Sequence, residues 1–253
     1  MGHPSDMTGK AALVTGAGGG LGQAVAVILA RAGADICIVD VKEAGLDETA
    51  KRIKDCGRKA LVHAADLSVA DNCPAAVAAT VQAFGRLDAL CNVAGVLKLA
   101  NSHEMPVADW NSVMAVNLTA PFLLSKAAIP HLLDSEGAIV NVTSIAAHMG
   151  QAYAAAYCAS KAGLAQLTKA MAMEYLKTPL RINAISPGGM VTEIGASFVP
   201  PAGADPQLLG RYRPIRGLVE VADMANMVAY LASPASAGFH GAVIQMDKAI
   251  TAG

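Results

Sequence analysis

A tyrosine and a lysine four positions apart, Tyr157 and Lys161, stand out in an Ala-rich segment of a chain in which only 15% of residues are charged. Because positions i and i+4 share one face of a helix, we expect the two side chains to lie together. A free tyrosine titrates near ~10, and a neighbouring ammonium favours the phenolate. We predict that this cation lowers the pKa of Tyr157 enough for the phenol to exchange protons with a substrate oxygen.

A serine, Ser144, follows the apolar run 138–142, which places it at the end of a predicted strand. Its hydroxyl could hold the substrate oxygen in the manner of an oxyanion donor. If hydride leaves the carbon whose hydroxyl proton Tyr157 removes, a secondary alcohol becomes a ketone, and the reverse reaction returns that proton. The three residues therefore predict an enzyme that interconverts alcohols and ketones.

A glycine-rich loop, T-G-A-G-G-G-L-G at 15–22, follows the first predicted strand. Gly16, Gly20 and Gly22 stand where the strand must turn sharply into a helix, with Leu21 between the last two. Glycine permits a positive φ and lets a pyrophosphate approach the backbone, and the helix that follows presents free N–H groups to the phosphates. The order of strand, loop and helix predicts a dinucleotide site.

An aspartate, Asp40, ends the second predicted strand, 18 residues after Gly22 (40 − 22 = 18). This spacing is close to the ~20 residues expected before the acid that binds a ribose 2′-OH. Such a carboxylate accepts hydrogen bonds from the ribose diol and repels a 2′-phosphate, and Lys42 is the nearest cation. We predict NAD as the cofactor and disfavour NADP.

Further nucleotide contacts are expected where the third and fourth predicted strands end, because open parallel sheets bind ligands at the carboxyl ends of their strands. Asp66, which precedes Leu67, could hydrogen-bond an adenine amino group. In N-V-A-G, Asn92 ends the fourth strand, and the small Ala94 and Gly95 leave room for a ribose.

Short β-branched runs alternate with Ala-rich stretches, and this alternation predicts the scaffold. Strands are expected at 11–15, 35–39, 60–64, 89–93, 138–142, 181–185 and 242–246, and helices near 21–32, 44–56, 70–84, 108–133, 153–177 and 220–232. We predict one α/β domain over 1–253, with a Rossmann-type, doubly wound, seven-stranded parallel sheet and helices on both faces. The Pro- and Gly-rich stretch at about 190–217 is expected to form a substrate lid.

Composition argues against several other classes of protein. A net charge of −1 and a pI of about 6.6 give no reason to expect nucleic acid or an anionic membrane as a partner. No apolar run reaches the roughly 18 residues of a spanning helix, and the first residues lack the pattern of a secretion signal, so we expect a cytoplasmic protein. Five cysteines without a C-x-x-C pair predict reduced core thiols, and no metal site is expected.

These motifs together resemble the short-chain dehydrogenase/reductase family, in its compact single-domain form, over essentially the whole chain. The resemblance is carried by 15–22, Asp66, N-V-A-G, Asn117, Ser144, Y-C-A-S-K at 157–161 and P-G-G-M-V-T at 187–192. It implies a Ser–Tyr–Lys site, in which Asn117 joins through a water that relays protons to Lys161.

The same resemblance implies further contacts and an assembly. Lys161 would hydrogen-bond the nicotinamide ribose, and the stretch that holds Pro187, Gly188, Met190 and Thr192 would contact the carboxamide. The helices at 108–133 and 153–177 would pair across a twofold axis in a homotetramer. One departure lies in M-D-K-A at 246–249, where the family usually has an aspartate followed by two glycines, so the C-terminal packing is expected to differ.

The substrate is expected to be an uncharged secondary alcohol or ketone of modest size, because the candidate pocket residues are mostly apolar. These residues are Ser144, Ala146, His148, Met149, Gln151, Tyr153, Tyr157, Val96, Leu97 and the 193–217 stretch. Two alternatives stay open: a reductase of 3-oxoacyl thioesters on acyl carrier protein, and a scaffold that binds NAD without turnover. Asp40 and the absence of a basic cluster argue against the first, and an intact Ser144–Tyr157–Lys161 set argues against the second.

Overall fold

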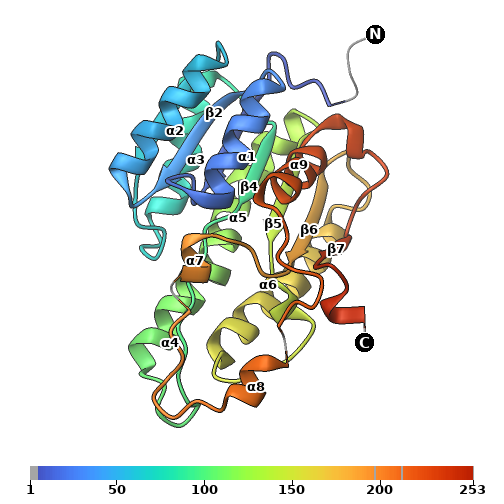
Figure 1. Ribbon diagram of the computed structural model, residues 1–253. Coiled ribbons are helices and arrows are strands. Elements are labelled where there is room, and N and C mark those ends of the chain that lie inside the picture. Colours follow the sequence, from blue (N-terminus) through green and yellow to red (C-terminus); the bar gives the residue numbers. More distant parts are fainter. Residues whose placement is uncertain (1–4, 197, 212, 253) are drawn as a thin grey trace.

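The seven predicted strands form one parallel sheet with the order β3-β2-β1-β4-β5-β6-β7. This order is seen in a computed structural model that describes residues 5–196, 198–211 and 213–252 (Figure 1). The strands are β1 Ala11–Thr15, β2 Asp35–Asp40, β3 Ala60–Ala64, β4 Ala89–Asn92, β5 Ala138–Val142, β6 Arg181–Pro187 and β7 Val243–Met246. Helices cover both faces, so the predicted α/β fold of the Rossmann type is confirmed.

The two faces of the sheet bury alternate residues of the same strands. On β1, Val14 packs with α1 (Gly20–Arg31), α2 (Glu43–Asp55) and α9 (Val221–Ala232). Its neighbour Leu13 packs on the other side with α3 (Asn72–Phe84), α5 (Ala120–Asp134) and α6 (Ala155–Glu174). Because both faces are covered, each strand can be apolar throughout, and this explains the runs that predicted it.

The strand order reverses between β1 and β4, which pair with Val14 opposite Cys91. The chain leaves these two strands toward opposite sides of the sheet, which opens a crevice at their carboxyl ends. The glycine-rich loop, the end of β4 and Ser144 after β5 therefore meet at one edge of the sheet.

The helix predicted at 108–133 contains a wider turn. It consists of α4 (Val107–Met114), a π-helical turn at Ala115–Thr119 and α5. The continuous stretch Val107–Asp134 is long and apolar enough, by length and composition, to cross a membrane; its hydropathy is 1.4 and 44% of its most apolar window is buried. Core helices of globular proteins pass the same test, so this stretch is only weak evidence for a membrane span, against the expectation from the sequence.

The stretch predicted as a lid holds two short helices, α7 (Glu193–Ala196) and α8 (Pro206–Gly210), and residues 197 and 212 within it lie outside the described residues. Figure 1 shows α8 beside the start of α6, at the end of the molecule that also holds α4. Several large apolar side chains of the stretch are exposed: Val191, Phe198, Val199, Leu208 and Ile215.

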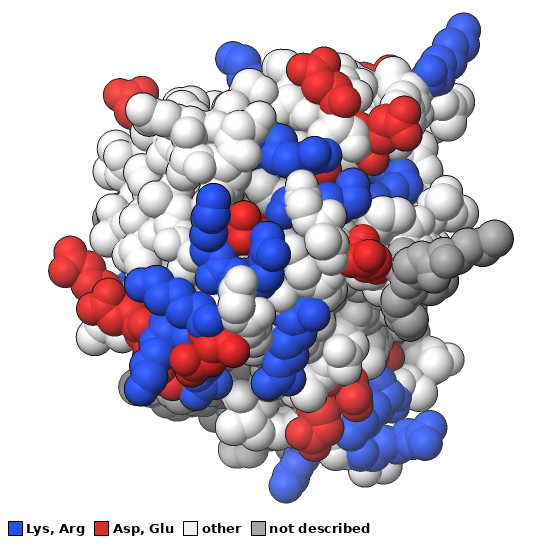
Figure 2. All heavy atoms as spheres, turned by 90° about the horizontal axis from the view of Figure 1, so that it is seen from above, with Lys and Arg blue, Asp and Glu red and all other residues white. Residues whose placement is uncertain are grey.

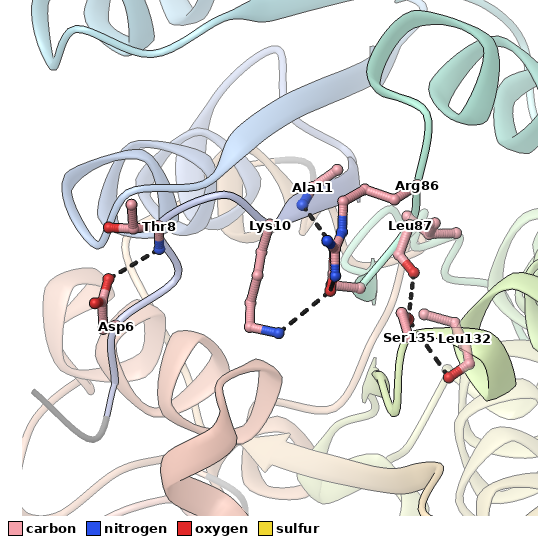
Figure 3. Close-up of polar contacts among 9 residues, drawn as sticks. Asp6, Thr8, Lys10, Ala11, Arg86, Leu87, Leu132 and Ser135 are labelled. Carbon is pink, nitrogen blue, oxygen red and sulfur yellow. Dashed lines mark hydrogen bonds and ion pairs between the residues drawn. The ribbon is translucent and has the colours of Figure 1, made fainter. Parts of the chain in front are cut away.

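At the amino edge of the sheet, a buried carboxylate organises the starts of β1 and β4. Asp88 accepts hydrogen bonds from the Ala11 amide at 2.9 Å and from Arg86 Nε and Nη2 at 2.7 and 2.6 Å, and Lys10 Nζ lies 3.3 Å away (Figure 3). Burial pushes the pKa of Asp88 upward, but the bonds from Arg86 and Ala11 and the charge of Lys10 bring it below its ordinary value. Charges of both signs also intermingle on the outer face at the end opposite α4 and α8 (Figure 2).

All five cysteines are free thiols. Burial raises the pKa of Cys37 and Cys73 to about 11 and that of Cys91 to about 12. Cys56 and Cys158 are only half-buried. The three core thiols therefore act as small apolar residues, as the sequence predicts.

Candidate active site

A cleft of about 760 Å³ opens at the carboxyl edge of the sheet. It is lined by most of the predicted cofactor residues: Gly16, Gly20, Leu21, Gly22, Asp40, Asp66, Leu67, Ala94, Gly95, Pro187, Gly188, Met190 and Thr192. Ser144, Tyr157, Lys161, Gln151, Val96 and Leu97 line the same cleft. Residues that the sequence places far apart thus share one cavity large enough for a dinucleotide and a small substrate.

The glycine-rich loop is held by close approaches between backbones. Gly16 has a φ of +68°, and a Cβ on it would lie 2.9 Å from the Ala94 backbone. A Cβ on Gly22 would lie 2.1 Å from the Gly16 carbonyl oxygen. Gly45, which we did not predict, is equally constrained, since its Cβ would lie 2.0 Å from the Gly18 carbonyl oxygen. A glycine inside the polar helix α2 was the available signal, because glycine is unfavourable there without a packing reason.

Asp40 lies beside this loop. Its carboxylate accepts hydrogen bonds from the Gly18 amide at 3.0 Å and from the Lys42 amide at 3.1 Å. Asp66, one strand further along the edge, accepts a bond from the Ser68 amide at 2.8 Å. A backbone cradle that a side chain would fill, the start of α1 and two acids along one cleft fit an NAD(P) dinucleotide.

Ser144, Tyr157 and Lys161 meet at the other end of the cleft. Ser144 caps a short 3-10 helix (Ile145–Ala147), with its hydroxyl accepting from the Ala146 amide at 3.2 Å, and it also hydrogen-bonds the Tyr157 phenol. Lys161 Nζ lies 5.7 Å from the centre of the Tyr157 ring and donates to the Val142 carbonyl at 2.9 Å. The spacing in the sequence therefore does bring phenol and ammonium together.

The pKa of Tyr157 contradicts the sequence-based prediction. Burial raises the pKa of the phenol above its ordinary value; the hydrogen bond from Ser144 opposes this, and the neighbouring Cys158 adds to it. Burial also lowers the pKa of Lys161 to about 8. The prediction considered the charge of Lys161 and neglected the withdrawal of both groups from water, which is the larger effect.

Asn117 lies in the π-helical turn, next to the cleft. Its Oδ1 accepts from the Val96 amide at 2.8 Å, and its Nδ2 donates to the Val96 carbonyl at 2.9 Å and to Ser160 Oγ at 3.1 Å. The side chain thus fixes the segment after β4 and the catalytic helix. A water relay from Asn117 to Lys161 stays a prediction.

Asn92 does not line the cleft: its Nδ2 donates to Asn141 Oδ1 at 2.8 Å, within a buried pair. Side chains alternate along a strand, and Leu90, two residues earlier, packs in the layer of α5 and α6. The side chain of Asn92 therefore points into that layer, and a contact of this residue with the cofactor stays a prediction.

Four predicted substrate residues also lie outside the cleft wall, for local reasons. Ala146 is buried in the 3-10 helix with 3% exposure, and the His148 ring is held by Ser186 Oγ at 2.8 Å. Met149 lines a second cavity, and the Tyr153 hydroxyl accepts from the Asp205 amide at 2.8 Å. The cleft wall instead includes residues that we did not predict: Ser112, Val116, Ile145 and Gly189, whereas Ile194 and Phe198 come from the predicted 193–217 stretch. Ser112 and Val116 stand four positions apart on the helical stretch that also holds Asn117, and Ile145 directly follows Ser144, so neighbouring positions were the available signal.

Comparison with known proteins decides the family. A family model described as short chain dehydrogenase matches residues 10–202. The chain belongs to the short-chain dehydrogenase family. Cis-4-hydroxycyclohexanecarboxylate dehydrogenase of Sinomonas cyclohexanicum is 38% identical over 96% of this chain and 97% of its own. The 2-dehydro-3-deoxy-D-gluconate 5-dehydrogenase of Escherichia coli is 34% identical over 95% of this chain and 95% of its own.

Solved structures of short-chain dehydrogenases agree with this assignment. A Mycobacterium paratuberculosis enzyme bound to NAD superposes with a TM-score of 0.90 at 28% identity, covering 98% of this chain and 100% of that chain. A Beutenbergia cavernae structure with bound NADP has a TM-score of 0.89 at 32% identity, covering 99% and 100%. The protein is accordingly an oxidoreductase of the alcohol dehydrogenase type that acts on CH–OH donors with NAD(P).

Proposed function

We propose that the protein is an NAD(H)-dependent dehydrogenase that interconverts a cyclic secondary alcohol and its ketone, with Tyr157 as the general acid and base. The observation that carries this proposal is that Ser144, Tyr157 and Lys161 meet in the wall of the same cleft as the glycine-rich loop, with Lys161 Nζ 5.7 Å from the centre of the Tyr157 ring. Binding alone would not require a phenol and an ammonium withdrawn from water at this place.

Each residue has a role that follows from its place. Ser144 donates to the substrate oxygen and holds it beside the phenol of Tyr157. Tyr157 removes the hydroxyl proton when the alcohol is oxidised and returns it when the ketone is reduced. Lys161 fixes the geometry through the Val142 carbonyl, and its neutral form can take up the proton from Tyr157. Bound NAD would accept or supply the hydride.

The preference for NAD is supported by Asp40. Its carboxylate is held toward the glycine-rich loop by the Gly18 amide, and a Cβ on Gly18 would lie 2.9 Å from Asp40 Cγ. A 2′-phosphate placed here would face a fixed negative charge. Because solved relatives bind either cofactor, the ratio of kcat/KM for the two decides this point: we expect at least about a tenfold preference for NAD, and equal values would contradict it.

The proposed substrate class is supported by the wall near Ser144. It carries the apolar residues Leu97, Ile145 and Ile194, which suit a ring without charge. Two relatives, cis-4-hydroxycyclohexanecarboxylate dehydrogenase and cyclohexanol dehydrogenase, are named for ring alcohols. A panel of cyclic and open-chain alcohols, followed by NADH appearance, tests this class; a preference for open-chain substrates would contradict it.

We further propose that the protein works as a cytoplasmic homotetramer. Apolar side chains stand exposed on the helices expected to pair: Trp110 and Phe122 on the 107–134 stretch, and Met173 near the end of α6. Sedimentation velocity provides the test, since a monomer would contradict this assembly.

Tyr157→Phe tests the chemistry directly. We expect turnover to fall at least about 1,000-fold, while the Kd for NAD stays within about twofold, because only the phenolic oxygen is lost. Tyr175→Phe, at the other end of α6, is the matched control and should leave both quantities unchanged. Turnover that survives in Tyr157→Phe would remove the assigned base.

A further inference from the structure

Tyr153, which stands two residues before α6, has an unusual backbone. Its φ is +68°, in the left-handed region that bulky residues rarely adopt. Strain of this kind persists where surrounding contacts hold it, and such positions cluster at functional sites. The contacts of Tyr153 show what holds it.

Two hydrogen bonds join Tyr153 to segments that lie far away in the sequence. Its carbonyl accepts from the Ala100 amide at 2.9 Å, which ties it to the loop after β4. Its hydroxyl accepts from the Asp205 amide at 2.8 Å, across a separation of 52 residues. Tyr153 also lies four residues before Tyr157, so one residue connects three segments around the substrate end of the cleft.

The bond to Asp205 positions α8. Asp205 caps this helix, with its Oδ1 accepting from the Gln207 amide at 2.7 Å. Leu208 of α8, Met149 and Ala152 together line a second cavity of about 390 Å³. Between these two residues lies Gln151, which lines the main cleft. The hydroxyl of Tyr153 thus holds α8 against the loop that forms part of the substrate wall.

We infer that Tyr153 is a positioning residue for the reaction: its hydroxyl holds α8 against the 149–152 loop, whose Gln151 lines the cleft, and its left-handed backbone is the conformation that allows this reach. The inference rests on the proposed function for its effect on catalysis, although the contact itself does not. Tyr153 does not line the cleft and takes no part in the proton transfer assigned to Tyr157, so loss of its hydroxyl should alter substrate binding and leave that transfer intact.

Tyr153→Phe removes the hydroxyl alone. We expect KM for the alcohol to rise about fivefold, as for the loss of one hydrogen bond, with kcat and the Kd for NAD within about twofold. Hydrogen–deuterium exchange in 199–211 should accelerate about fivefold, because the Asp205 amide loses its acceptor. Exchange at 96–104 should stay the same, since the Tyr153 carbonyl remains. Tyr175→Phe serves as the matched control.

Asp205→Pro removes the same bond from its other end. The φ of Asp205 is −73°, which proline adopts, and Asp205→Ala separates the loss of the helix cap from the loss of the amide. If both variants break one bond, Tyr153→Phe combined with Asp205→Pro should raise KM no further than the weaker-binding single variant. Additive effects on KM would overturn the inference.

Unchanged exchange and unchanged KM in Tyr153→Phe would also overturn it. The exchange measurement requires no turnover, so it decides on the contact even if Tyr157→Phe contradicts the proposed function. The two proposals can therefore fail separately.

Discussion

Each edge of the sheet buries a charged residue to a similar degree, but the two residues differ in whether groups of opposite charge surround them. At the amino edge, Asp88 is 2% exposed and is surrounded by Arg86, Lys10 and the Ala11 amide. At the carboxyl edge, Lys161 is 3% exposed and donates to the Val142 carbonyl, with no carboxylate within ion-pair distance in the described parts of the chain. The cost of burying a charge is thus offset by hydrogen bonds and opposite charges at Asp88, and is offset far less at Lys161.

This difference separates a stabilising group from a reactive one. Compensation holds the pKa of Asp88 below its ordinary value, so that it stays charged at neutral pH. Without compensation, burial brings the pKa of Lys161 to about 8, where a proton can come and go. A polar group that has been left short of partners is therefore a better marker of function than burial itself.

The largest effect is expected from Asp88→Asn. Removing this charge leaves Arg86 and Lys10 without their partner, and because both are partly exposed we expect a loss of about 2 kcal/mol in the free energy of unfolding. The values of kcat/KM should stay within about twofold. Denaturant unfolding and initial rates measure the two quantities.

Glu48→Gln is the control for this prediction. It removes an exposed pair with Arg52 on α2 and should change the free energy of unfolding by less than about 0.5 kcal/mol. A large loss of activity in Asp88→Asn at unchanged stability would break the contrast between the edges. Because the pKa of Asp88 is lowered in the folded protein, this residue also makes the free energy of unfolding depend on pH. Its stabilising contribution is present above about pH 4 and is lost as the pH falls through the folded-state pKa.

A smaller effect is expected from pH. Because the neutral form of Lys161 can take the proton from Tyr157, kcat/KM for alcohol oxidation should rise about tenfold through a midpoint near pH 8. Ketone reduction should change little there, since the raised pKa of Tyr157 keeps its proton in place. The same step in Lys161→Met would show that another group titrates.

The folded-state pKa of Lys161 also predicts a change in stability. This pKa lies below the ordinary lysine value of 10.5, so the unfolded chain binds more protons between about pH 8 and that value. The contribution of this residue to the free energy of unfolding therefore rises with pH over that range.

The smallest effect is expected from backbone strain at the carboxyl edge. After β7, Lys248 and Ala249 have φ values of +53° and +72°, where the family usually has glycines. Asp247 holds this turn by accepting from the Ala249 and Thr251 amides, both at 2.9 Å. The expected departure in C-terminal packing thus takes the form of a strained turn with its own support.

Ala249→Gly should relieve the left-handed strain of ~1–2 kcal/mol, offset by the ~0.5–1 kcal/mol that glycine loses in chain entropy. We expect a gain of about 0.5 kcal/mol in stability, read as a small rise in Tm. Ala170→Gly, at an exposed position inside α6, should instead destabilise by about 1 kcal/mol. Equal signs in the two variants would show that strain is not stored at Ala249.

Much of the fold and of the cofactor end could be predicted from the sequence because the signals there are local. Apolar runs predicted every strand to within two residues, and Gly16, Gly22 and Asp40 lie where spacing along one βαβ unit placed them. Tyr157 and Lys161 share a helix, so a separation of four residues was sufficient to bring them together.

The substrate end was predicted less well because its contacts join distant segments. The bond from Asp205 to Tyr153 spans 52 residues, and that from His148 to Ser186 spans 38. No periodicity in the sequence indicates either hydrogen bond. The direction of the Tyr157 pKa was also missed, because desolvation depends on what packs around a residue and not on the spacing of its neighbours.

The unequal burial of the five thiols has a practical consequence. Alkylating reagents attack the thiolate, so Cys37, Cys73 and Cys91 should be inert while the protein is folded, and labelling should begin at Cys56 and Cys158. Cys158 directly follows Tyr157 on α6. A fluorophore attached there, in a variant that lacks Cys56, would give an optical signal from the catalytic helix without any introduced residue.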